Sequence, residues 1–143
     1  MKLSSQRLNP AKAAGIWHKT NIAGEEVSFK IASQKSPAYQ TALLKLVEEE
    51  KLKNKLGKAD LAKSVIENKT KALELFAEHI LLDWKGITDD AGKEIPYSRD
   101  LAKELVDENI FPDIAQFIID RSSATEAYLG EVVKEAIDDA KNE

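Results

Sequence analysis

The chain has 143 residues, a formal net charge of −4 and no cysteine. This length is typical of a single domain that buries a core without metal or disulfide cross-links. The absence of cysteine excludes a disulfide framework, a thiolate nucleophile and a Cys-ligated zinc site, and it suits a reducing bacterial cytoplasm.

No segment has the apolar length that a membrane requires. Residues 1–10 lack the apolar region of a signal peptide, and no later run approaches the roughly 18 apolar residues of a transmembrane helix. We therefore expect a soluble, internal protein.

The N-terminal part predicts an arm followed by a β-hairpin. Residues 1–13 are basic and have little apolar periodicity, and Pro10 interrupts them, so we expect a mobile arm. In residues 14–33, apolar and polar positions alternate around a turn candidate at Asn21–Gly24, a pattern typical of paired strands.

Residues 36–82 predict two helices. Ser36 can cap the first helix and Pro37 suits its first position, while Gly57 is a natural stop. Asp60 can cap the second helix, whose wide apolar stripe continues to the end of this range. The second helix is the expected scaffold of the domain.

Residues 83–98 predict a compact turn motif. Ile87 and Ile95 can pair as the ends of a very short hairpin around an acidic, Gly-containing turn. Trp84 is expected to bury its ring at the end of the long helix while its indole N–H finds an acceptor. Direct contact of Trp84 with a partner is the alternative.

Residues 98–140 predict an acidic helical half that begins at Ser98, a helix-capping residue. The net charge is +4 over residues 1–35 and −9 over residues 82–143. An acidic half disfavours nucleic-acid binding, which depends on cations that contact phosphates. An acidic docking surface and ordinary solubility both remain as interpretations of this charge.

These elements together predict a mainly α fold with a small N-terminal β-hairpin (α+β). Its amphipathic helices are expected to pack as one small domain over residues 14–140.

The sequence offers no convincing catalytic, cofactor or metal site. An EF-hand register with Gly92 at its sixth position places Ile87 and Ala91 at ligand positions, which excludes that calcium loop. His79 and Asp83 share a helical spacing but have no second nearby His or Cys to complete a zinc site. A metal-dependent enzyme around these two residues is a weak alternative, and we expect a non-catalytic protein.

The central motif resembles that of a known protein family. Residues 83–97 read DWKGITDDAGKEIPY, which is similar to the motif of tail assembly chaperones of long-tailed phages. Residues 29–32 and 36–39 resemble the "FxIA…NPAY" step of that family, so the resemblance spans about residues 15–130. The motif residues, which form a structural elbow and a candidate partner contact, are Asp83, Trp84, Gly86, Ile87, Gly92, Pro96 and Tyr97.

The resemblance implies a phage or prophage tail assembly chaperone. Such a protein binds the helical tape measure protein and keeps it soluble while tail tube subunits polymerise, and it is absent from the mature virion. The tail tube protein, further copies of the chain and a longer frameshifted form are additional expected partners; Lys141-Asn142 is compatible with a slippery run of adenines in the gene.

The resemblance also suggests where the partner binds, because the family has an amphipathic segment after the motif. The candidate apolar partner-binding face comprises Phe117, Tyr128, Leu129 and Val132. The alternative function is that of a small non-catalytic adaptor or regulatory protein with a different helical partner.

Overall fold

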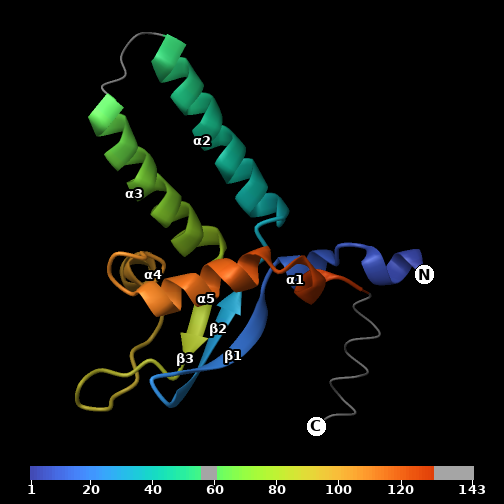
Figure 1. Ribbon diagram of the computed structural model, residues 1–143, viewed down its shortest axis with the longest axis vertical. Coiled ribbons are helices and arrows are strands. Elements are labelled where there is room, and N and C mark those ends of the chain that lie inside the picture. Colours follow the sequence, from blue (N-terminus) through green and yellow to red (C-terminus); the bar gives the residue numbers. More distant parts are fainter. Residues whose placement is uncertain (56–60, 131–143) are drawn as a thin grey trace.

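The computed structural model describes residues 1–55 and 61–130 of the chain. These residues form a three-stranded antiparallel sheet with helices on one face and a helical hairpin at one end (Figure 1). The strands are β1 (Ile16–Ile22), β2 (Glu25–Ile31) and β3 (Leu81–Lys85). The helices are α1 (Pro10–Ala13), α2 (Pro37–Lys55), α3 (Leu61–His79), α4 (Arg99–Leu105) and α5 (Pro112–Ser123), with 3₁₀ turns η1 (Leu3–Gln6) and η2 (Thr125–Tyr128).

The predicted class, mainly α with a small N-terminal β-hairpin, is wrong. The domain is a small α+β fold, because Leu81–Lys85 forms a third strand instead of the end of a helix and the start of a turn. The apolar run from Ile80 to Leu82 continues the helical stripe of α3, and a short apolar run does not distinguish helix from strand. Tertiary packing decides the conformation: the edge of β2 needs partners for its backbone groups, and β3 supplies them.

The sheet has the order β1-β2-β3. Phe29 pairs with Trp84 and Ile31 pairs with Leu81, so four buried side chains come together on one face. The register shifts between Lys30 and Ile31, where β3 has an extra residue opposite β2. This bulge lets both Leu81 and Trp84 point inward although three positions separate them.

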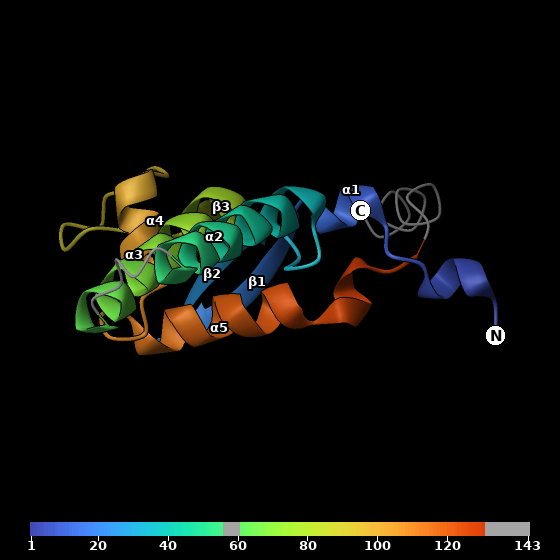
Figure 2. The same ribbon diagram turned by 90° about the horizontal axis from the view of Figure 1, so that it is seen from above.

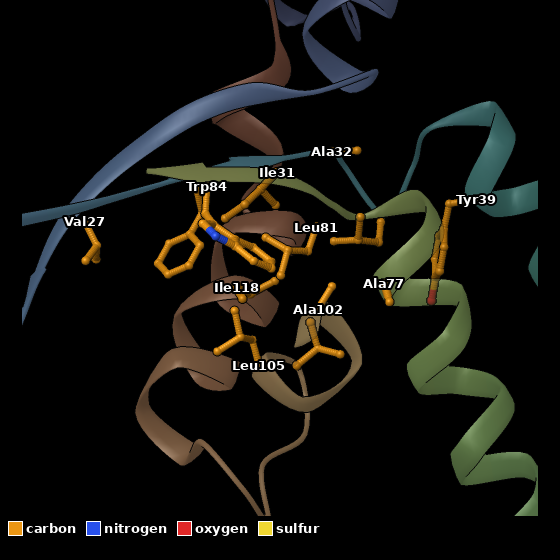
Figure 3. Packing of buried hydrophobic residues seen from close by; sticks show 13 residues of the cluster. Val27, Ile31, Ala32, Tyr39, Ala77, Leu81, Trp84, Ala102, Leu105 and Ile118 are labelled. Carbon is orange, nitrogen blue, oxygen red and sulfur yellow. The ribbon is translucent and has the colours of Figure 1, made fainter. Parts of the chain in front are cut away.

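Helices α4 and α5 cover that buried face of the sheet, and Figure 2 shows α5 running along it. In the core, Leu81 and Trp84 from the sheet point toward Leu105 of α4 and Ile118 of α5 (Figure 3). The hairpin of α2 and α3 extends away from this body in Figure 1. Near its base, Tyr39 packs edge-on against the Phe76 ring, with 5.6 Å between the ring centroids.

The motif segment after β3 is tied to both the sheet and α3. The Trp84 indole N–H donates to the Ile95 carbonyl oxygen at 2.8 Å, and the Trp84 ring lies 4.9 Å from the Tyr97 ring, centroid to centroid. The Tyr97 hydroxyl donates to the Ala77 carbonyl oxygen at 2.7 Å and also lies 3.1 Å from that of Leu81. These bonds fix the direction in which the chain leaves β3.

Two local predictions are confirmed in this region. The Ile95 N–H donates to the Ile87 carbonyl oxygen at 2.8 Å, so these residues do close a short hairpin. The Ser98 hydroxyl accepts a hydrogen bond from the Leu101 N–H and caps α4. By contrast, the hydroxyl of Ser36 before α2 makes no hydrogen bond with the described residues.

Part of the predicted N-terminal arm lies against the C-terminal end of the described chain. Asn9 is buried and caps α1, and its N–H donates to the Tyr128 carbonyl oxygen at 2.8 Å. The Lys12 ammonium donates to the Leu129 carbonyl oxygen at 2.6 Å.

Three sequence predictions concern residues outside those that the structure describes. They are the helix stop at Gly57, the cap at Asp60 and the part of the acidic half beyond Gly130.

Two glycines of the motif give a matched test of this geometry. Gly86 and Gly92 have φ of +88° and +82°, which disfavour a side chain. A Cβ at Gly86 would also lie 2.7 Å from the Glu26 carbonyl oxygen, whereas nothing lies within 4 Å of one at Gly92.

We expect Gly92→Ala to lower the free energy of unfolding by about 1–2 kcal/mol, because a residue with a side chain is strained at this positive φ. Gly86→Ala should cost about 1–3 kcal/mol more, because β2 and β3 must separate to admit the methyl group. Urea denaturation of the two variants measures the difference. Equal losses would show that the approach of Gly86 to β2 is not tight in solution.

Candidate functional site

An apolar pocket lies at the end of the sheet where the β1–β2 turn, the motif segment, α4 and the start of α5 meet. Its volume is about 300 Å³, which is at the small end of the range for ligand pockets. Two motif residues, Gly86 and Ile87, form part of its wall. The motif thus contributes to a cavity as well as to the internal packing.

The wall of this pocket is made of side chains from several elements. Ile22 and Val27 come from β1 and β2, and Leu101 and Leu105 come from α4. Ile95 of the motif, with Phe111 and Ile114 at the start of α5, contributes further apolar side chains. Glu25 is the one charged residue among those that line the pocket.

The pocket is suited to binding an apolar group. Its lining offers many aliphatic contacts but few hydrogen-bonding groups, so an apolar side chain gains by leaving water there. The exposed Glu25 of its lining favours a partner with a cation beside its apolar group.

The other motif residues lie partly in the core and partly at the surface. Trp84 is 4% exposed, and its indole N–H has its acceptor within the domain. The Asp83 carboxylate accepts a hydrogen bond from the Trp84 N–H at 2.8 Å. Tyr97 is half-buried against α3, whereas Pro96 and Gly92 are exposed. The motif residues are therefore split between the core, the pocket and the surface.

The residues of the predicted partner-binding face do not form one open surface. Tyr128 is wholly buried. Phe117 is half-buried, with its ring 5.9 Å from the Phe29 ring and 5.4 Å from the Arg121 guanidinium carbon. Leu129 is half-buried and makes an isolated β-bridge with Leu8. Val132 lies outside the described residues.

Tyr128 instead connects the C-terminal segment to the sheet. Its hydroxyl donates to the Ile31 carbonyl oxygen at 3.2 Å and lies 3.1 Å from His18 Nε2. A hydroxyl has a single hydrogen, so with that hydrogen on the Ile31 carbonyl oxygen it accepts from the His18 tautomer that carries a proton on Nε2. Burial raises the pKa of Tyr128, so its hydroxyl keeps its proton at neutral pH.

Sequence reasoning did not identify the pocket. The sequence pattern assigns Ile22 to the turn candidate at residues 21–24, whereas in the structure it ends β1. The same pattern makes Leu101 and Leu105 ordinary core residues of a helix. Their meeting around Gly86 and Ile87 depends on the third strand, which the sequence pattern did not predict.

Within residues 1–55 and 61–130, no three His, Asp or Glu side chains lie close enough together to hold a metal ion. The helices in the described part of the chain are all too short or too polar to span a lipid bilayer.

Comparison with protein families identifies a phage or prophage protein. The chain belongs to the family described as YdaY prophage protein, whose sequence model matches residues 33–140. The matched range begins after β2 and includes α2, α3, β3, α4 and α5. No curated protein and no solved structure matches the chain.

The partial burial of His18 predicts a pH-dependent stability. Burial, and secondarily the positive charge of Arg121, lower the pKa of His18 below its ordinary value of 6.5. The folded state therefore binds a proton more weakly than the unfolded state. The stabilisation is complete above pH 6.5 and is lost as the pH falls from 6.5 through the folded-state pKa.

We expect the free energy of unfolding to fall between about pH 7.5 and pH 5.5, and to fall less in His18→Gln, which has no imidazole to protonate. Urea denaturation at both pH values measures the change. Asn21→Gln, which changes an exposed residue of the same strand and no titratable group, is the control and should retain the pH dependence of the wild type. An equal slope in the wild type and His18→Gln would contradict the assignment to His18.

Proposed function

We propose that this prophage protein is a tail assembly chaperone that binds the tape measure protein and keeps it soluble during polymerisation of the tail tube. The observation that carries the proposal is the apolar pocket lined by Gly86 and Ile87, two residues of the motif that resembles that family. The match to a prophage protein family is consistent with this role and does not itself specify it.

The pocket supports this role through the chemistry of its partner. A tape measure protein is a long helical chain whose apolar stripes aggregate when they are exposed to water. A helix of this kind presents anchor side chains at i, i+3 and i+4, and one such side chain can enter a cavity of about 300 Å³. Glu25 favours an anchor that is followed by Lys or Arg on the partner helix.

We also propose a location, a multimeric mode of action and additional partners for this protein. The protein is non-catalytic, acts in the host cytoplasm and is absent from the virion. Several copies act together on one tape measure chain, and the tail tube protein and a frameshifted longer form are additional partners. The nucleotide sequence tests the longer form: it requires a slippery run near the codons for Lys141-Asn142, which lie outside the described residues, and an overlapping downstream frame.

Closing the pocket should abolish binding of the tape measure protein. In Ile22→Lys, a charged side chain replaces half-buried apolar surface in the pocket wall. We expect the variant to lose co-purification with the tape measure protein of the same genome and to leave that protein insoluble on co-expression. Asn21→Lys is the matched control, because Asn21 is exposed on the opposite face of the sheet and does not line the pocket.

A second variant tests the pocket at a position where the substitution should not impair folding. Thr88 is exposed and lines the pocket, so Thr88→Lys should block binding without a large cost in stability. Circular dichroism checks that each variant is folded. If both folded pocket variants still solubilise the tape measure protein, the pocket is not its binding site. If the wild-type protein neither co-purifies with it nor improves its solubility, the adaptor alternative replaces the chaperone function.

A further inference from the structure

Helix α2 exposes apolar side chains away from α3. Leu44 is 60% exposed, Leu52 58% and Val47 42%, and we call these three residues the outer face of α2. The other side of α2 carries the buried Tyr39, which packs against Phe76 of α3. Three large apolar side chains on one side of a protruding helix indicate a surface that another protein covers.

A groove of about 270 Å³ lies between α3 and the segment that joins α4 to α5. The charged residues of its lining are Lys69, Asp107 and Glu108. A neighbouring hollow of about 340 Å³ shares Leu73 and Asp107 with it and adds Glu104. We call the two together the α3–α4 groove; its apolar lining comprises Ala72, Leu73, Phe76, Val106, Ile110 and Ile119.

The two surfaces differ in the sign of their net charge. The groove lining has four acidic residues, Asp100, Glu104, Asp107 and Glu108, against Lys69 and Lys103. The exposed residues around the outer face are Lys45 and Lys51 against Glu48, which lies four residues after Leu44 and four before Leu52. Lys45 and Lys51 are exposed on α2 near the outer face, and neither forms an ion pair with a described residue. Glu104 and Glu108 beside the groove are likewise without an ion pair among the described residues. A helix with the polarity of α2 therefore suits the groove in both its apolar and its charged groups.

We propose that copies of this chain associate head to tail, with the outer face of α2 of one copy in the α3–α4 groove of the next. A single contact then covers both apolar surfaces. A pair of α2 helices packed against each other would bring two convex surfaces together and leave the groove open. Because the two surfaces differ, the contact is heterologous and generates a ring or a chain of copies.

The arrangement of the hairpin is compatible with repeated contacts. In Figure 1, α2 lies on one side of α3 and α4 on the other. The outer face of one copy can therefore engage a neighbour while its own groove engages another. Helix α2 has 19 residues and is roughly 28 Å long.

This inference specifies the contact behind the multiple copies stated in the proposed function. It concerns surfaces other than the apolar pocket, and its test uses the chain alone. Its failure is thus distinguishable from a failure to bind the tape measure protein.

The test measures molar mass by light scattering and analytical ultracentrifugation over a concentration series of the full chain. Leu44→Arg combined with Leu52→Arg disables the outer face, and Ala72→Arg disables the groove. All three sites are exposed on helices, where Arg is a good helix former, so the variants should fold. We expect the wild-type mass to rise with concentration and each variant to remain a monomer.

An equimolar mixture of the two variants is the decisive measurement. Each contributes the surface that the other lacks, so the mixture should form a dimer and nothing larger. Glu74→Arg is the control, because Glu74 is exposed on α3 outside the groove, and it should associate like the wild type.

Three results would overturn the proposal. A wild-type chain that is monomeric at every concentration removes the contact. Association of Ala72→Arg alone, with no mixed dimer, shows that α2 pairs with itself. A folded Glu74→Arg that stays monomeric shows that the groove is not the specific site.

Discussion

The environment of Trp84 holds the parts of this domain together. Its backbone pairs β3 with Phe29 of β2, and its ring fills the space between the sheet and the helices. Its indole N–H binds the Ile95 carbonyl group, and its ring contacts Tyr97, whose hydroxyl binds the end of α3 at Ala77. A buried indole N–H without an acceptor would be costly, so this bond fixes the return of the motif segment. Sheet, turn and helix therefore share one anchor.

The binding surfaces depend on that anchor. The motif segment folds back beside β2 because Gly86 admits the close approach to Glu26, and this leaves the pocket between Ile87 and α4. The same anchor fixes the base of α3, so the hairpin of α2 and α3 projects from one end of the sheet. The pocket and the groove are thus separate surfaces on one rigid base. This separation allows a tape measure contact and a contact between copies to coexist in the proposed function.

Local signals predicted part of this structure. Ser98 was recognised as a cap because its hydroxyl bonds to its own helix, and the closure of Ile87 with Ile95 depends on the turn between them. Strand β3 was missed because its apolar residues also continue the stripe of α3, and only the edge of β2 distinguishes the two conformations. The pocket was missed for the same reason, since Ile22 and Leu101 meet only after β3 has formed.

The sequence by itself determined the strand alternation of β2, the cap and turn signals, the absence of cysteine chemistry and the motif around Trp84. These follow from the chemistry of neighbouring residues. The tertiary structure decided that Leu81–Lys85 is a strand, that Tyr128 is buried beside His18, and that Gly86 and Ile87 border a pocket. Each of these depends on contacts between residues far apart in the chain, which no local pattern specifies.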